Sequence, residues 1–203
     1  MTRSSASGRP AVPGELKPEL IRKSLHLLIA LVPILAALNR SHTALLLMGG
    51  ILFYTWAESL RFLGFTLPFI SSTTAVVSRK WETERFSLGP VTLGLGALLA
   101  LLLFPPQAAA VAIYSLAFGD STATLAGKFL GRIRPAFMAG KSLEGSLACF
   151  IASFLVAFLV LRDWKIALVA GLASAVAEAL PTKDFDNILL PLASGLAVLL
   201  CKL

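Results

Sequence analysis

The stretch SLACFIASFLVAFLVL, residues 146–161, carries no charged residue and is apolar along almost its whole length. A run of this kind approaches the roughly 20 apolar residues that a helix needs to cross a bilayer. Similar runs recur along the chain, and we expect a membrane span at each of seven segments: Leu25–Leu38, Thr43–Leu60, Leu88–Phe104, Gln107–Gly127, Ser146–Leu161, Lys165–Leu180 and Asn187–Leu200. The sequence therefore predicts an all-α fold, a polytopic transmembrane helical bundle of about seven spans.

The composition of the whole chain agrees with this prediction. Of the 203 residues, 57% are hydrophobic and 14% are charged, and the mean hydropathy of +0.82 is far above what a soluble domain needs. The formal net charge is +7, but the basic residues lie between the apolar runs, where they set membrane topology. We therefore expect the lipid bilayer as a partner and no nucleic acid.

The remaining segments define the domain organisation. Residues 1–18 are rich in Ser, Pro and Gly and contain no apolar run, which predicts a flexible cytoplasmic tail rather than a cleaved signal peptide. Residues 19–203 are expected to form a single transmembrane domain. The segment Thr66–Val77 is apolar but too short to span a bilayer, and it predicts an interfacial or re-entrant piece.

The distribution of Lys and Arg predicts the orientation. With the N-terminus inside, fourteen of the 18 basic residues fall on the inner side: Arg3, Arg9, Lys17, Arg22, Lys23, Arg61, Arg79, Lys80, Arg85, Lys128, Arg132, Arg134, Lys141 and Lys183. Four fall on the outer side: Arg40, Arg162, Lys165 and Lys202. This asymmetry favours a cytoplasmic N-terminus.

The segment GDSTATLAGK, residues 119–128, is the most informative for function. Asp120, Thr124 and Lys128 recur every four residues and so share one face of a helix. Small residues form a smooth ridge beside that face: Gly119, Ala123, Gly127 and Gly131. This pattern suits an ion and a phosphate chain close to the backbone, although the glycines alone also fit a helix-packing motif. Asp120 favours function, because an ionisable residue in a membrane segment is costly.

The loop KSLEGS, residues 141–146, lies directly before an apolar run. Ser142 and Gly145 can present backbone N–H groups at a helix N-terminus, and Lys141 adds a positive charge, so the loop predicts an anion site. A simple serine helix cap beside a topology-setting lysine is the alternative.

The segment Glu178–Asn187 concentrates three carboxylates and one amide between two spans. Such oxygen ligands suit Mg²⁺ rather than zinc, and a solvated acidic turn is the alternative. All three elements fall on the same side in the orientation above. Together they describe a site for a nucleotide with Mg²⁺ beside a lipid head group.

Two further groups of residues lie on the inner side. Glu58 and Arg61 are one turn apart, and Lys23 and His26 lie at the inner end of the first span. They could contact a lipid head group, or they could be an ion pair and an interfacial anchor with purely structural roles.

Four motifs together carry a resemblance to a known family. They are ELIRKSLH at residues 19–26, GDSTATLAGKFLG at 119–131, KSLEGS at 141–146, and Glu178 with Pro181, Asp186, Asn187 and Pro191. In this order they resemble the dolichol kinase, phytol kinase and CTP-dependent diacylglycerol kinase family, which is related to phosphatidate cytidylyltransferases. The resemblance covers roughly residues 19–200 and makes residues 19–203 one transmembrane catalytic domain.

The resemblance implies transfer of the γ-phosphate of CTP, with Mg²⁺, to a membrane lipid alcohol at the cytoplasmic face. The acceptor would be a polyprenol or dolichol, phytol or diacylglycerol. The residues expected to be catalytic are Asp120, Lys141, Glu144, Glu178 and Asp186, with Asp120 and Asp186 as the metal ligands. The residues expected to bind the nucleotide are Gly119, Ser121, Thr124, Gly127, Lys128, Lys141, Ser142, Gly145 and Asn187. Glu144 or Glu178 is expected to orient or deprotonate the lipid hydroxyl.

Two other functions remain open from the sequence. A cytidylyltransferase would use the same CTP and metal but form a CDP-lipid, and a transporter would line an ion path with Asp120, Glu178 and Lys128. The chain is shorter than eukaryotic dolichol kinases and looks closer to small prokaryotic members, which favours a prokaryotic plasma membrane. The lipid acceptor and the oligomeric state stay open.

Overall fold

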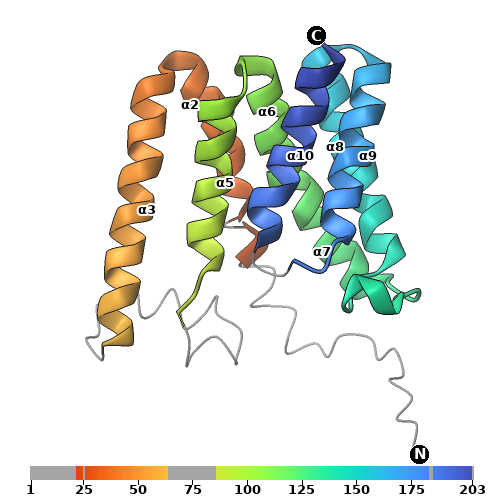
Figure 1. Ribbon diagram of the computed structural model, residues 1–203, viewed down its shortest axis with the longest axis horizontal. Coiled ribbons are helices and arrows are strands. Elements are labelled where there is room, and N and C mark those ends of the chain that lie inside the picture. The colour runs from red at the N-terminus through yellow and green to blue at the C-terminus, as the bar shows by residue number, and fades with distance from the viewer. Residues whose placement is uncertain (1–21, 25, 64–85, 183–184, 203) are drawn as a thin grey trace, which may run out of the picture.

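The computed structural model of the protein describes residues 22–24, 26–63, 86–182 and 185–202. Every regular element within these ranges is helical, so the all-α prediction is confirmed there. The helices stand side by side with their long axes roughly parallel (Figure 1). The expected N-terminal tail and the segment Thr66–Val77 lie outside the described residues.

The helical elements follow the seven apolar segments in order. Their bounds are η1 Leu28–Leu31, α2 Val32–Leu38, α3 Arg40–Phe62, α5 Gly89–Leu103, α6 Pro106–Tyr114, η2 Ser115–Gly119, α7 Asp120–Phe129, η3 Ala136–Met138, α8 Leu143–Leu161, α9 Trp164–Ala179 and α10 Asp186–Cys201. The elements α6, η2 and α7 form one continuous helix, because η2 is a π-helical turn between them. Each predicted segment thus matches one helical segment, with bounds that differ by a few residues.

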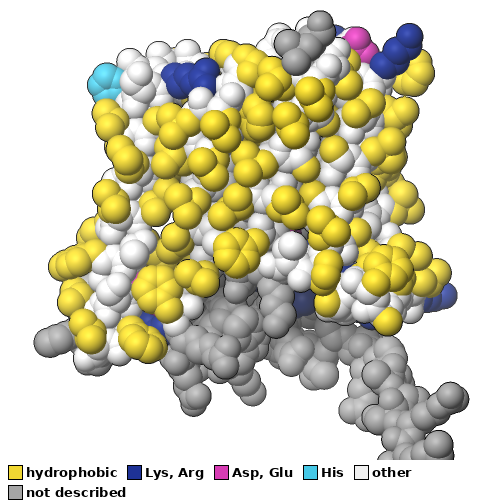
Figure 2. Space-filling view, in the orientation of Figure 1, with side chains coloured by type: hydrophobic (Ala, Val, Ile, Leu, Met, Phe, Trp, Pro, Cys, Tyr) yellow, Lys and Arg dark blue, Asp and Glu magenta, His cyan; other side chains and the backbone are white. Residues whose placement is uncertain are grey.

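Apolar side chains cover the middle of the bundle, and charged side chains gather at its two ends (Figure 2). Within the described residues, three helical stretches are long and apolar enough to cross a membrane: Arg40–Phe62, Pro106–Phe129 and Leu143–Leu161. Gly89–Leu103 and Asp186–Cys201 are shorter apolar helices. The prediction of about seven spans therefore remains a prediction, although a largely apolar surface of this kind is unusual for a soluble monomer.

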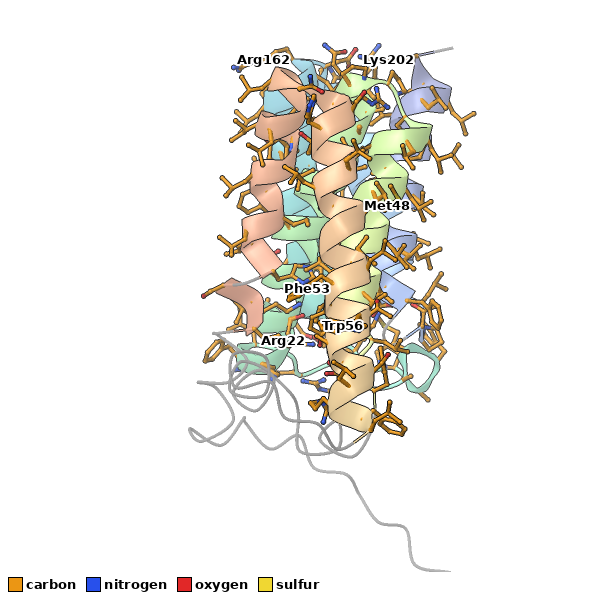
Figure 3. All side chains as sticks on the ribbon, turned by 90° about the vertical axis from the view of Figure 1, so that its left-hand side faces the viewer. Arg22, Met48, Phe53, Trp56, Arg162 and Lys202 are labelled. Carbon is orange, nitrogen blue, oxygen red and sulfur yellow. The ribbon has the colours of Figure 1, made fainter. Side chains whose placement is uncertain are left out.

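The two ends of the bundle differ in their elements. We call the end where α7 ends, α8 begins, α9 ends and α10 begins the loop end; it lies at the bottom of Figure 1. Figure 3 shows Arg22 near the loop end and Arg162 and Lys202 at the opposite end. The same view faces α3, with Met48, Phe53 and Trp56 along it. This helix is peripheral, because it packs mainly against α5 and α2.

Polar residues at the helix ends explain where several helices begin. Asn39, Ser142 and Asp163 are the N-caps of α3, α8 and α9, and each accepts a hydrogen bond from a backbone N–H of the first turn. Such caps satisfy N–H groups that have no partner within the helix. At the opposite end, Arg40 donates to the carbonyl oxygens of Leu101 and Phe104. Two of the carbonyl groups at the end of α5 thereby gain a hydrogen-bond partner.

Small residues hold the helices close together. A Cβ atom at Gly145 would lie 2.8 Å from the carbonyl oxygen of Ala123, so α8 approaches α7 at a position that only glycine allows. Likewise, the backbone of Asn187 in α10 approaches Gly96 in α5. Pro191 has no N–H to offer the Asn187 carbonyl one turn earlier, which leaves that oxygen free to face α5. Close backbone packing through small residues is typical of helices in membranes.

Candidate functional site

Asp120 is the first residue of α7, directly after the π-helical turn of Ser115–Gly119. Its carboxylate accepts a hydrogen bond from the ammonium group of Lys23, with which it forms an ion pair. The exposed fraction of Lys23 is only 4%, and that of His26 is 7%. A charged pair at such low exposure is costly to assemble, and this favours a role beyond stability.

His26 completes this first group. Its Nε2 atom lies 3.1 Å from Oδ2 of Asp120, yet this buried nitrogen makes no aligned hydrogen bond within the described residues. The ring also hydrogen-bonds the backbone of Leu116, inside the π-helical turn. A π-turn changes the hydrogen-bonding register of a helix, and such turns are frequent at functional sites. The turn therefore positions both Asp120 and the histidine beside it.

Lys141 is the centre of a second group. Its Nζ atom lies 2.8 Å from Oδ2 of Asp186 and 3.9 Å from Oε1 of Glu178. It also donates to the carbonyl oxygens of Glu178 and Leu180, the latter at 2.8 Å. One lysine thus joins the loop before α8 to the end of α9 and the start of α10.

Two hydroxyl groups orient the carboxylates of the second group. Ser146 donates to Oε2 of Glu178 at 2.8 Å, and Thr182 donates to Asp186. The other carboxylate oxygen of Glu178, Oε1, lies 3.9 Å from Nζ of Lys141. This distance is too long for a hydrogen bond. Glu178 therefore has one anchored oxygen and one oxygen available for a hydrogen-bond donor.

The two groups are close enough to interact electrostatically. Asp120 interacts electrostatically with both Glu178 and Asp186. The buried thiol of Cys149 interacts electrostatically with Asp120, Glu178 and Lys141. Asp120 of α7, Glu178 of α9 and Asp186 of α10 are therefore within electrostatic range of one another. We call the residues Lys23, His26, Asp120, Lys141, Glu178 and Asp186 the ionic cluster.

The donor set of the ionic cluster fits Mg²⁺ by its chemistry. Mg²⁺ prefers oxygen ligands and usually takes one or two carboxylates together with substrate phosphates and water. Among the described residues, no three His, Cys, Asp or Glu side chains are close enough to hold a metal ion by themselves. A binding mode that needs phosphate oxygens as well as carboxylates agrees with both facts.

The glycines predicted to bind nucleotide lie at the contact between α7 and α8. A Cβ atom at Gly127 would lie 3.1 Å from Oγ of Ser142, and one at Gly119 would lie 2.6 Å from Oγ of Ser153. Gly145 takes part in the same contact. In this structure the glycine ridge packs against α8, which is the helix-packing alternative considered above.

Ser142 and Glu144 stabilise the start of α8. Ser142 accepts a hydrogen bond from the N–H of Gly145 at 3.1 Å, as a helix cap does. Glu144 accepts hydrogen bonds from the N–H groups of Arg132 and Ile133, at 2.9 and 3.1 Å. Glu144 therefore holds the loop after α7 against the start of α8. Its hydrogen bonds within the described residues do not involve the ionic cluster.

Other predicted residues connect helices at the loop end. Asn187 donates from its side-chain amide to Thr92 and to the Gly89 carbonyl of α5. Arg61 donates twice to the fully buried Glu58, which also accepts from the N–H of Ser87. These contacts join α10 and α3 to α5.

The remaining predicted residues lie on α7. Thr124 and Lys128 are half-buried, and Lys128 is in the last turn of that helix. Ser121 is buried, and its hydroxyl has no hydrogen-bond partner among the described residues.

Sequence reasoning underestimated part of the cluster. Lys23 and His26 were expected to be lipid contacts or structural residues, but the structure brings them to Asp120. Ser146 and Thr182 were not among the expected site residues, although both lie in motifs that were singled out. Their proximity to the carboxylates depends on the folded arrangement of three helices, which local sequence does not reveal.

Comparisons with known proteins agree with the family suggested by the motifs. The chain is 33% identical to the phytol kinase of Synechocystis sp. over 150 residues, which are 70% of this chain and 63% of the relative. It is 30% identical to the dolichol kinase of Saccharomyces cerevisiae over 182 residues, which are 84% of this chain and 34% of the relative. A probable phytol kinase of Oryza sativa subsp. japonica is 32% identical over 143 residues, which are 61% of this chain and 45% of the relative.

These alignments cover between 34% and 63% of the relatives' own lengths. No family model matches the chain, and no solved structure matches it. The similarity covers between 61% and 84% of this chain. Relatives named phytol kinase and dolichol kinase, at about 30% identity, support the assignment of the chain to the polyprenol and phytol kinase family.

Proposed function

We propose that the protein is a membrane-embedded lipid kinase that transfers the γ-phosphate of CTP to the hydroxyl group of a lipid alcohol. The names of the relatives support the reaction class, and the motif resemblance supports CTP as the donor. The observation that carries the proposal is the ionic cluster. It gathers two lysines and three carboxylates at one end of an apolar bundle, where a soluble nucleotide and a lipid head group can meet.

The nucleotide is expected to bind on the Asp120 side of the cluster. Asp120 and Asp186 would hold Mg²⁺, which supplies charge neutralisation to the phosphate oxygens. Lys141 lies 2.8 Å from Asp186, so its ammonium group is in reach of phosphate bound beside that carboxylate, and Lys128 adds positive charge at the end of α7. Phosphoryl transfer depends mainly on such positioning and charge stabilisation.

The acceptor hydroxyl is expected to meet Glu178. Ser146 anchors one carboxylate oxygen, and the other oxygen can accept the proton of the alcohol. The alcohol oxygen then forms a bond to the γ-phosphorus, while the bond between that phosphorus and the bridging oxygen of CDP breaks. The proton passes to Glu178 and CDP leaves. Of the two glutamates considered from the sequence, Glu178 fits this role better, because Glu144 is bound to backbone N–H groups.

Isotope-labelled CTP tests the reaction directly. Purified protein with Mg²⁺ is incubated with polyprenols, phytol, diacylglycerol or phosphatidate, and CTP carries the label at either the γ- or the α-phosphate. We expect label in lipid from the γ-position only, and the labelled product identifies the acceptor. Label from the α-position only would establish a cytidylyltransferase. Label from neither position, together with ion flux in vesicles, would establish a transporter.

The orientation is the second part of the proposal: about seven spans, with the N-terminus and the loop end in the cytoplasm. Basic side chains at the loop end support it through the positive-inside rule: Arg22, Lys23, Arg61, Lys128, Arg132, Arg134 and Lys141. Cys201 is exposed at the far end of α10, whereas Cys149 is buried.

The exposed cysteine provides a test of this orientation. We expect a membrane-impermeant maleimide to label Cys201 in intact cells, because the far end of α10 would face outward. A C201S variant should not be labelled, since Cys149 is buried. In an R132C/C201S variant, the new cysteine lies in the exposed loop after α7, so labelling should require permeabilised cells. The reverse pattern would contradict a cytoplasmic loop end.

A further inference from the structure

An open apolar groove of about 410 Å³ lies between α9 and α10, two helices that stand side by side in Figure 1. Its lining includes the small side chains Ala173, Ala177 and Ala193 and the larger, exposed side chains Leu172 and Val176. Ala177 is buried and the other two alanines are half-buried. The alanines therefore form the floor of the groove, and the larger residues form its rim.

One end of this groove coincides with the ionic cluster. Leu180 lines the groove, and its carbonyl oxygen accepts a hydrogen bond from Nζ of Lys141 at 2.8 Å. Ala177, also in the lining, directly precedes Glu178. On the other wall, Leu189 lies one helical turn after Asp186. An apolar chain in the groove would therefore have its polar end beside Lys141, Glu178 and Asp186.

The length and the apolar lining of the groove suit an extended hydrocarbon chain. The lining residues on α9 and its C-cap extend from Val169 to Leu180, a distance of roughly 16 Å at 1.5 Å per residue. The eight lining residues are all Val, Leu or Ala, so a hydrocarbon chain that lies along the groove contacts apolar side chains throughout.

We infer that the groove between α9 and α10 binds the hydrocarbon chain of a single-chain isoprenoid alcohol and presents its hydroxyl group to Lys141 and Glu178. This inference rests on the proposed kinase function and names the acceptor class and its binding surface. Selectivity for chain length then depends on α9 and α10, and the chemistry depends on the ionic cluster.

Filling the groove tests the inference through substrate length. A193F and A173F each place a large ring on the groove floor, from α10 and from α9. For phytol, we expect each variant to lower kcat/KM by roughly 10- to 100-fold, the size of effect that pocket contacts have on apolar substrates. For the short alcohol prenol, kcat/KM should stay within about twofold of the wild type. A37F is the matched control, because Ala37 is exposed on α2, away from the groove; it should change neither value.

Cross-linking gives a second result that does not require turnover. We expect a phytol analogue with a diazirine in its chain to label peptides of α9 and α10, and the label should be displaced by phytol but not by diacylglycerol. Labelling spread evenly over α3 and the other helices would overturn the inference, as would displacement by diacylglycerol alone or an A193F variant that behaves like A37F. If the wild type phosphorylates no alcohol, the proposed function fails, and cross-linking still decides whether the groove binds the chain.

Discussion

The D120N variant is expected to lose phosphoryl transfer, with kcat/KM lowered by about 10³-fold or more. The asparagine is nearly the same size as aspartate but carries no charge, so it binds a divalent cation beside phosphate oxygens much more weakly than the carboxylate does. A loss of about 4 kcal/mol of transition-state stabilisation corresponds to this factor. The measurement is transfer of γ-phosphate label from CTP to lipid, together with Mg²⁺-dependent binding of CTP in detergent.

Stability must be separated from catalysis in this experiment. The D120N change leaves the buried ammonium group of Lys23 without its carboxylate partner, and breaking a buried ion pair typically costs about 3–5 kcal/mol. The double variant K23M/D120N removes both charges, and its thermal midpoint should recover toward that of the wild type. We expect CTP binding and turnover to stay lost in the double variant. Turnover within tenfold of wild type in either variant would show that Asp120 is structural.

The K141M variant is expected to have the second large effect, again about 10³-fold or more on kcat. Lys141 is the only cation recorded beside Asp186 and Glu178 within the described residues, and a single positioned cation can supply this factor in phosphoryl transfer. Methionine keeps much of the apolar length of the lysine but leaves two carboxylates without a counter-charge. The measurement is single-turnover transfer of γ-phosphate label at saturating CTP.

Two further variants serve as controls for the K141M result. K165M removes an exposed lysine at the opposite end of the bundle, beside Trp164, and should keep wild-type activity. K141R keeps the charge but replaces the compact ammonium group with a planar fork that cannot reproduce the same contacts. We expect K141R to lie between K141M and the wild type. Equal activity of K141M and K165M would remove Lys141 from the mechanism.

The sequence predicted the helical segments well because each is an apolar run that ends at polar residues or prolines. Asn39 separates α2 from α3, Pro105 separates α5 from α6, and Asp163 caps α9. These are local signals, and local signals determine where helices begin and end. The π-helical turn before Asp120 was not predicted, because no residue pattern in Ser115–Gly119 distinguishes it from an α-helix.

The site was predicted only in part, because the local sequence reveals charged residues but not which of them meet in the folded bundle. The carboxylates and Lys141 were found because charged residues in apolar surroundings are conspicuous. The ion pair of Lys23 with Asp120 joins residues 97 positions apart, and only the packing of the helices brings them together. Glu144 has the same residue type as Glu178, yet one accepts from backbone N–H groups and the other from Ser146. Sequence alone cannot separate such roles.

The ionic cluster also bears on how the protein is made. Lys23 lies in the first helical residues of the described chain, Asp120 lies in its middle and Asp186 opens its last helix. A chain still emerging from the ribosome, or one cut short before α10, lacks a carboxylate on which Lys141 depends. We expect nascent and truncated chains to be inert toward nucleotide, so that biosynthesis itself confines phosphate transfer to the completed bundle.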